Sequence, residues 1–486
     1  MKLMPTRLSR LVLSVFTLAG LGLSSSDWVE KPAPVTPPNV VLFFMDDMGY
    51  GDLSVTGALD YTTPNLDKMA AEGTRFTNFL AAQAVCSASR AALLTGCYPN
   101  RLGISGALGP NSPIGLNPNE ETLAELLKER GYATGMFGKW HLGDNKQFLP
   151  LQQGFDEYYG VPYSHDMWPL HPAQAQAKYP PLRWIEGNEQ KEEIKDLDDA
   201  AEITGTITER AVSFIRNHKK KPFFLYIPHP LPHVPLAASA TFKGKTARGI
   251  FGDVLTELDW SVGQILGELK QQGLDKNTLV LFISDNGPWL NYGDHAGSSG
   301  GFREGKGTSF EGGHRVPFLV RWPGVVPAGR VSNKLLTALD ILPTVANVCG
   351  ARLPKQRIDG VDWVALLKGD NTVTPRDKFY YYYRKNSLEA VRQGEWKLVF
   401  AHPGRTYEGF LPGQNGKPGP STETHEFPAA LYDLRRDSGE RYDVREQHPE
   451  VVAQLEKIAE EARADLGDDI QKRTGANVRE PGRISQ

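Results

Sequence analysis

Short continuous hydrophobic runs that end abruptly in polar residues recur along the chain. The clearest are residues 39–47 (NVVLFFMDD) and residues 278–287 (TLVLFISDNG). Runs of this kind, rich in β-branched and aromatic residues and without alternation, are typical of strands buried on both faces of a mainly parallel sheet. Less pure versions of the same pattern occur in YATGMFGKWHLG, KPFFLYIPHPLPHVP and HRVPFLVRWPG.

Amphipathic stretches with helix start and stop signals lie between these runs. TPNLDKMAAEG has Thr63 as its cap, Pro64 in its first turn and Gly73 as its stop. NEETLAELLKERG, ITERAVSFIRNH and VLTELDWSVGQILGELKQQG are further predicted helices. The alternation predicts an α/β fold, in which a mainly parallel or mixed central sheet carries helices on both faces. Ligands of such sheets bind at the carboxyl ends of the strands.

The pattern changes after about residue 374. FYYYYR, EWKLVF and LYDLRRDSGERYD predict a small antiparallel sheet, and PEVVAQLEKIAEEARADL predicts an amphipathic helix. We therefore expect a catalytic α/β domain over residues 39–374 and a smaller C-terminal subdomain over residues 375–486. The segment 163–199, rich in His, Trp and Pro, is expected to be an irregular insertion that faces the substrate.

The N-terminus has the pattern of a signal peptide over residues 1–26. Basic residues precede the apolar run LVLSVFTLAGLGL, and small residues follow it. The run is short for a membrane span, although a signal anchor is the alternative interpretation. Residues 27–38, which contain KPAPVTPP, are expected to be a stiff linker. We expect an exported protein, periplasmic or extracellular, with no membrane span in the mature chain.

The amino-acid composition gives no indication of a nucleic-acid-binding protein or of a disulfide-stabilised one. The 486 residues are 40% hydrophobic and 23% charged, with a formal net charge of -3 and no long run of one sign, so nothing indicates a nucleic-acid partner. Three cysteines are too few, and odd in number, for the disulfide framework of an exported protein. Cys97 and Cys349 are expected to be buried apolar residues. Cys86 needs a different explanation.

Two oxygen-rich pairs follow the two clearest strands. Asp46 and Asp47 end the first, and Asp285 and Asn286 end the later one, so both pairs are expected at the same edge of the sheet. Converging carboxylates repel each other unless a cation lies between them. Oxygen ligands favour a hard divalent ion, calcium before magnesium. The sequence therefore predicts a metal site at this edge.

Cys86 precedes a short predicted helix, SASRAALLTG, that ends at Gly96. Its side chain would lie at the positive end of the helix dipole, with Arg90 one turn later on the same face. Both effects favour an anion at position 86. The alternative is a buried cysteine beside a surface arginine.

Further cationic and histidine side chains follow other predicted strands or lie in a glycine-rich loop. They are Lys139 and His141 in GKWHLG, His229 and His233 in PHPLPHVP, and Lys306 in REGKGTSFEGGHRVP. Together with a metal ion, such a set would hold a compact tetrahedral oxyanion, and a histidine would protonate the leaving oxygen.

These residues resemble the sulfatase family, specifically the arylsulfatase A type of the alkaline-phosphatase-like superfamily. The matching motifs are CSASRAALLTG, GKWHLG, DNG and GKGTSFEGGHRVPFLVRWPG, with GVPYSHD and LYDLRRDSGE also similar. The resemblance runs from residue 39 to about residue 443. It implies that a formylglycine-generating maturation enzyme oxidises Cys86 during export. In the family, one hydroxyl of the hydrated aldehyde attacks sulfur and expels the alcohol, and the other hydroxyl then releases sulfate.

The resemblance also implies a set of metal ligands around one Ca²⁺ ion. They are Asp46, Asp47, Cys86 as formylglycine, Asp285 and Asn286.

The remaining family roles concern the aldehyde and the sulfate group. Arg90 and Lys139 would hold the hydrated aldehyde, and His141 would assist its proton transfers. His233 and Lys306 would bind the sulfate, and one of them would help the leaving group depart. Lys139 and Ser164, in PYSHD, would be further sulfate contacts. We prefer His233 to His229 because HVP matches the family's His-x-Pro.

The expected function is therefore hydrolysis of a sulfate monoester, either a sulfated sugar or an aryl sulfate. One alternative is a phosphonate or phosphate ester hydrolase of the same superfamily, although the sequence has no additional Asp/His cluster for a second metal. Another is a sulfated-glycan binding protein without turnover. Against that reading stands the complete set of reactive residues, because a binding protein does not need an aldehyde precursor.

Overall fold

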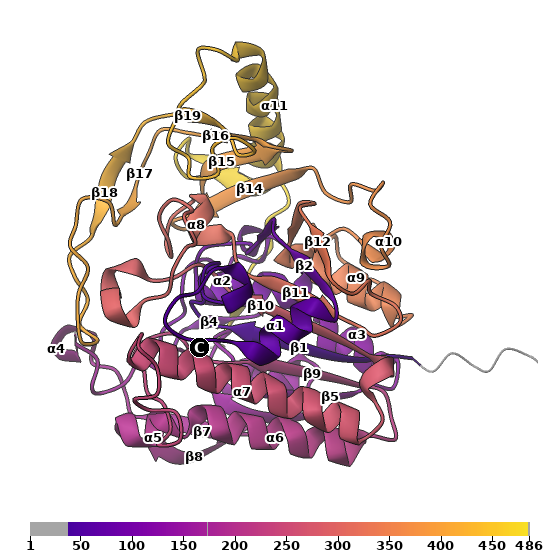
Figure 1. Cartoon of the computed structure of the whole chain (residues 1–486). Helices are drawn as coiled ribbons and strands as arrows, with labels where there is room; N and C mark the ends of the chain where they lie inside the picture. Colours follow the sequence, from indigo (N-terminus) through magenta and orange to yellow (C-terminus); the bar gives the residue numbers. More distant parts are fainter. Residues whose placement is uncertain (1–36, 173, 485–486) are drawn as a thin grey trace, which may run out of the picture. The chain divides into compact units, whose positions relative to one another are not determined.

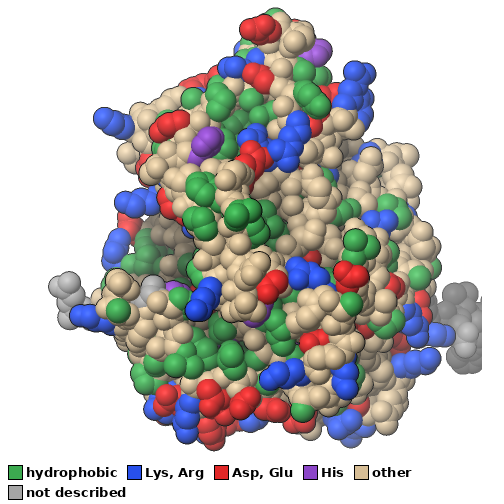
Figure 2. Space-filling model, turned by 60° about the vertical axis from the view of Figure 1, so that its left-hand side comes forward, with side chains coloured by type: hydrophobic (Ala, Val, Ile, Leu, Met, Phe, Trp, Pro, Cys, Tyr) green, Lys and Arg blue, Asp and Glu red, His purple; other side chains and the backbone are tan. Residues whose placement is uncertain are grey.

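The computed structural model describes residues 37–172 and 174–484. The expected signal peptide and nearly all of the expected linker lie outside the described residues. Within the described residues, no helix combines the length and the apolar character that crossing a membrane requires. On the face drawn in Figure 2, basic and acidic side chains are interspersed.

The central sheet is built around parallel strands, and antiparallel pairs occur toward both of its edges. Its strand order is β12-β2-β11-β10-β1-β9-β5-β6-β7-β8. The parallel strands are β10 (Thr278–Ser284), β1 (Asn39–Met45), β9 (Phe223–Pro228), β5 (Ala133–Lys139) and β6 (Glu157–Val161). The edges are β12 (Arg330–Ser332), β2 (Thr74–Phe76), β11 (Phe318–Arg321), β7 (Leu182–Glu186) and β8 (Glu189–Ile194). The sheet is thus mixed, and the HRVPFLVRWPG strand, β11, runs antiparallel to β10.

Helices cover both faces of this sheet, as Figure 1 shows. Successive side chains of β1 enter two separate cores because side chains alternate along a strand: Val40, Leu42 and Phe44 enter one, and Val41, Phe43 and Met45 the other. The first core includes residues of α2 (Cys86–Thr95), α3 (Leu123–Glu129) and α9 (Ile341–Val348). The second includes residues of α1 (Pro64–Ala71), α6 (Ile203–His218) and α7 (Ile250–Gln271). The expected α/β fold class is confirmed.

A smaller antiparallel sheet follows the central sheet in sequence. It consists of β14 (Lys378–Tyr383), β15 (Ser387–Gln393), β16 (Trp396–Val399) and β19 (Ala430–Asp433), in that order. α11 (Pro449–Leu466) packs against β15 and β16. Between β16 and β19 the chain forms a hairpin of β17 (His402–Thr406) and β18 (Thr422–Phe427). The expected antiparallel sheet and helix are present, whereas the exact domain boundary at residue 374 stays a prediction.

The remaining strands and α-helices are short. They are β3 (Phe79–Leu80), β4 (Ile114–Gly115), β13 (Leu336–Thr337), β20 (Gly467–Asp468), β21 (Arg473–Thr474), β22 (Gly482–Arg483), α4 (Gln174–Ala177), α5 (Leu197–Ala201), α8 (Glu311–His314) and α10 (Val364–Leu367).

The segment 163–199 differs from its expected irregular structure. It contains α4 and the antiparallel pair β7 and β8, which extends the central sheet by pairing with β6. The ring of Trp184 stacks on Tyr159 of β6, with ring centroids 4.9 Å apart. This packing buries Trp184, and it explains why a segment without clear alternation becomes part of the sheet.

Candidate active site

The two oxygen-rich pairs meet at the carboxyl edge of the central sheet. β1 and β10 pair in parallel with Met45 opposite Ser284, so Asp46 and Asp285 leave the sheet at the same level. The backbone N–H of Asp47 donates to Oδ1 of Asp285 at 3.1 Å. Asp47 adopts a positive φ of 63°, and the chain leaves the strand there. The in-register pairing of two hydrophobic strands is therefore what brings the acidic residues together.

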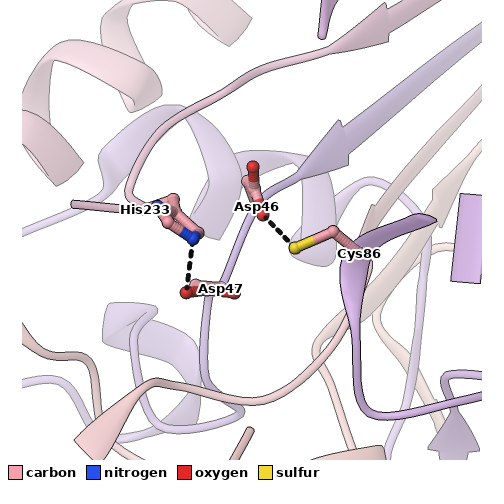
Figure 3. Close-up of side chains that lie close together, drawn as sticks. All are labelled: Asp46, Asp47, Cys86 and His233. Atoms are coloured by element: carbon pink, nitrogen blue, oxygen red, sulfur yellow. Dashed lines mark hydrogen bonds and ion pairs between the residues drawn. The ribbon is translucent and has the colours of Figure 1, made fainter. Parts of the chain in front are cut away.

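Asp46, Asp47, Cys86 and His233 form a cluster of potential metal ligands (Figure 3). One ligand atom from each residue lies within 4.8 Å of the others, and all four residues are buried. The Cys86 thiol donates to Oδ1 of Asp46 at 3.3 Å, and Nε2 of His233 lies 3.5 Å from Oδ2 of Asp47. The expected ligand set of the metal did not include His233.

Asp285 and Asn286 adjoin this cluster. Nδ2 of Asn286 donates to Oδ1 of Asp47 at 2.7 Å, while its buried Oδ1 finds no hydrogen-bond partner among the described residues. Burial and the neighbouring Asp46 carboxylate raise the pKa of Asp285 to about 7. An unsatisfied amide oxygen beside three carboxylates is a donor set that suits a hard divalent cation such as Ca²⁺. The residues present therefore fit the expected ion.

Arg90 and Lys139 supply buried positive charge on one side of the carboxylates. Nη2 of Arg90 donates to Oδ2 of Asp285 at 2.7 Å, and Nη1 donates to the backbone oxygen of Lys139 at 3.0 Å. Nζ of Lys139 contacts Oδ2 of Asp46 and donates to Oγ of Ser164 at 3.0 Å. Arg90 is fully buried, so the alternative of a surface arginine beside Cys86 is wrong.

The charge balance decides the ionisation of Asp46. Burial by itself would raise the pKa of this carboxyl, but Lys139, His233 and Arg90 outweigh burial and lower the pKa well below its usual range. Asp46 is therefore an anion at neutral pH and can bind a cation.

Lys306 lies on the opposite side, against Asp47. Its Nζ is 2.7 Å from Oδ1 of Asp47 and 4.5 Å from the ring centroid of Trp289. Burial opposes the charge of this lysine, but the Asp47 carboxylate outweighs burial and raises its pKa well above the usual range. Trp289 also faces His233, with ring centroids 5.5 Å apart. Trp289 was not among the site residues expected from the sequence, although it follows the DNG motif by two residues.

The three histidines differ in environment. Burial and Lys139 lower the pKa of His141 well below its usual range, and its Nε2 lies 2.9 Å from the backbone oxygen of Leu108. His229 contacts Oγ of Ser261, in α7, at 3.4 Å, and burial lowers its pKa to about 3. His233 is the histidine that contacts Asp47.

Cys86 is the first residue of α2, which ends at Gly96 with a φ of 71°. Burial and the nearby Asp46 carboxylate raise the pKa of its thiol. A protonated thiol is a poor nucleophile, because the thiolate is the reactive form. The thiol is therefore protonated, contrary to the anion expected at position 86, because burial and Asp46 outweigh the helix terminus and because Arg90 donates to Asp285 instead. In this state Cys86 does not favour ordinary cysteine chemistry. In the described part of the chain, all three cysteines are buried and unpaired with each other, as expected for Cys97 and Cys349.

Models of known protein families match this chain. The family model described as "Sulfatase" matches residues 38–351, and the model "C-terminal region of aryl-sulfatase" matches residues 374–481. A third model, "N-sulphoglucosamine sulphohydrolase, C-terminal", matches residues 303–401. 

Two curated relatives match at similar identity. Arylsulfatase A of Bos taurus is 40% identical over 441 residues, which cover 86% of this chain and 86% of that protein. N-acetylgalactosamine-6-sulfatase of Sus scrofa is 40% identical over 471 residues, which cover 92% of this chain and 88% of that protein. 

The crystal structure of the PsFucS1 sulfatase from Pseudoalteromonas sp. has a TM-score of 0.79 at 28% identity, covering 88% of this chain and 90% of that chain. The alkaline-phosphatase-like fold expected from the sequence is thereby confirmed.

Proposed function

Because the chain belongs to the sulfatase family and is a sulfuric ester hydrolase, we propose that it acts through a formylglycine made from Cys86 and through one bound Ca²⁺ ion. The observation that carries this proposal is the position of Cys86. Its protonated thiol contacts Asp46 at the centre of the charged site, where a cysteine has no other evident use. When bound and formed, the two groups supply a hydrated aldehyde as nucleophile and a positive charge that orients the sulfate oxygens.

The ligands that we propose for Ca²⁺ are the oxygen-rich residues at the strand ends. They are Asp46, Asp47, Asp285 and Asn286, together with the modified residue 86. Arg90 and Lys139 would keep the modified side chain in place, because both are buried and reach the same carboxylates. His141, held neutral by burial, would accept and return a proton there.

The proposed sulfate contacts lie on both sides of this group. Lys139 and Ser164 already contact each other at 3.0 Å, and Lys306 approaches from the opposite side. His233 would protonate the leaving oxygen, since its Nε2 faces Asp47 at the edge of the cluster. We propose a sulfated sugar or an aryl sulfate as substrate, which the names of the relatives support.

The proposed location of the protein in the cell is linked to the modification of Cys86. A formylglycine-generating enzyme must act on Cys86 before the buried site closes, and we propose that this happens during export of the protein to the periplasm or the cell exterior. We also propose that residues 39–374 form the catalytic domain and residues 375–486 the C-terminal subdomain.

The test of the proposed chemistry is the mass of the peptide that contains Cys86. In protein expressed together with a formylglycine-generating enzyme, we expect the mass loss that corresponds to replacement of the thiol by an aldehyde. The same sample should release sulfate from 4-nitrophenyl sulfate or from a sulfated monosaccharide. An unmodified thiol in an active sample would refute the aldehyde, whereas an aldehyde without sulfate release from either substrate would direct the search to phosphonate esters.

The two candidate histidines give a second prediction. His233→Ala should lower kcat about 10²-fold, because it removes a general acid, whereas His229→Gln should change kcat by less than about threefold. His229 is neutral at any assay pH above its pKa of about 3 and faces Ser261. Steady-state kinetics with thermal melts of both variants would check this. A larger loss of kcat in a folded His229→Gln variant would reverse the assignment.

A further inference from the structure

The loop that carries Lys306 is held by a hairpin from the C-terminal subdomain. We call residues 402–427, which comprise β17, β18 and the loop between them, the arm. In Figure 1 the arm leaves the small antiparallel sheet and runs down one side of the described chain toward α4.

Two side chains of the arm converge on the backbone oxygen of Lys306. Oη of Tyr407 donates to this oxygen at 2.6 Å, and Nη1 of Arg405 donates to it at 3.5 Å. Arg405 also donates to Oη of Tyr407 at 3.4 Å and to Oε1 of Glu423, on the partner strand, at 2.6 Å. The hydroxyl of Tyr407 is thus fixed by one cation and aimed at one carbonyl.

The arm also contacts residues before and after Lys306 in the loop. The buried carboxylate of Glu304 accepts hydrogen bonds from Oγ1 of Thr406 and, at 2.9 Å, from the backbone N–H of Tyr407. At Gly307 a Cβ atom would lie only 2.6 Å from Nη1 of Arg405, and the residue has a φ of 82°. The arm therefore packs directly on the loop backbone, where only glycine fits.

The loop between β17 and β18 also forms hydrogen bonds with the segment that carries Trp289. The backbone N–H groups of Gly413 and Gly419 donate to the backbone oxygen of Asn291 at 2.8 and 2.7 Å. Asn291 follows Trp289 by two residues, and the ring of Trp289 contacts the Lys306 ammonium. The arm thus restrains both the backbone that carries Lys306 and the ring on which its ammonium rests.

We propose that the arm is a positioning element, in which Tyr407 fixes the backbone of Lys306 so that its ammonium meets the sulfate group. The inference rests on the proposed sulfate contact of Lys306. The ammonium of a lysine is a compact point charge on a flexible stem, so its position beside a small anion depends on holding both the backbone that carries it and the ring on which it rests. Small misplacements of this kind lower rates strongly, because catalysis depends on the orientation of the reacting groups.

The test is the variant Tyr407→Phe, which removes only the hydroxyl. We expect kcat/KM for 4-nitrophenyl sulfate to fall about fivefold, as for the loss of one buried hydrogen bond, with the melting temperature nearly unchanged. The matched control is Tyr382→Phe, whose hydroxyl donates to the backbone oxygens of Ala462 and Gly467, away from the loop. The control should keep the kcat/KM of the wild type.

A double-mutant cycle distinguishes positioning from general structural support. If Tyr407 acts through Lys306, Tyr407→Phe should have no further effect on kcat/KM in the Lys306→Ala background. Binding of inorganic sulfate, measured by titration calorimetry, gives a readout independent of turnover and should weaken in both single variants. Additive effects in the cycle, or full activity and sulfate binding in Tyr407→Phe, would overturn the proposal. A Lys306→Ala variant with wild-type turnover would instead refute the proposed role of Lys306 itself.

Discussion

Cys86→Ala should abolish turnover while leaving the fold intact. We expect kcat to fall at least about 10⁴-fold, because no other side chain at the site can replace the group that attacks sulfur. The stability cost should be small, about 1 kcal/mol, since alanine suits the first turn of α2 and the lost thiol makes one weak hydrogen bond to Asp46.

The measurement is a set of progress curves with a sulfated sugar and an aryl sulfate, on protein whose folding is verified by circular dichroism. Cys97→Ala is the matched control, because Cys97 is also buried but lies near Asp359 and Arg479 rather than at the site. The control should turn over at nearly the wild-type rate. A folded Cys86→Ala protein with undiminished turnover would exclude the formylglycine mechanism.

Removal of the proposed Ca²⁺ ion has the second large expected effect. Exhaustive chelation should lower kcat at least about 10²-fold, because the ion supplies several kcal/mol of charge stabilisation in such sites. Without it, the oxygen of Asn286 stays unsatisfied among the described residues, and Asp285 stays buried beside the Asp46 carboxylate, which raises its pKa. Added Ca²⁺ should restore activity better than Mg²⁺, which demands a stricter octahedral geometry.

Metal content and thermal stability give independent readouts of this experiment. The metal-free protein should melt at a lower temperature, since an ion that binds only the native state stabilises it by mass action, by about 4 kcal/mol at a thousand times its Kd. Elemental analysis must show that the ion has left. Full activity in protein verified to be metal-free would reject the cation assignment.

The alternation of buried strands and capped helices along the sequence was sufficient to predict the fold class. β1 and β10 were predicted correctly because a continuous apolar run can be satisfied only between two covered faces. The direction of β11 was not predictable in this way, since a buried strand has the same sequence pattern whether its neighbour runs parallel or antiparallel. The hairpin of β7 and β8 was missed because edge strands carry many polar residues, as the exposed β8 does.

In the candidate site, too, some residues could be predicted from the sequence and others could be assigned only from the structure. Asp46, Asp47, Cys86 and Lys139 could be named from motifs that lie at strand ends and a helix start, and the structure brings them together. The choice between His229 and His233, four residues apart in one loop, could be supported in sequence only by a family motif. In the structure His229 contacts α7 and His233 contacts Asp47.

The sequence by itself therefore determined the most strongly patterned strands and helices, the fold class, the family and most of the reactive residues, because hydrophobic patterning and short motifs are local properties of the chain. Only the tertiary structure decided which charged side chains of the site lie next to one another and which distant residues fix their positions. The pKa of Asp46 depends on Lys139 and Arg90, and the backbone of Lys306 is bound by Tyr407, a hundred residues further along the chain. Such contacts depend on how distant segments pack, and no local pattern encodes them.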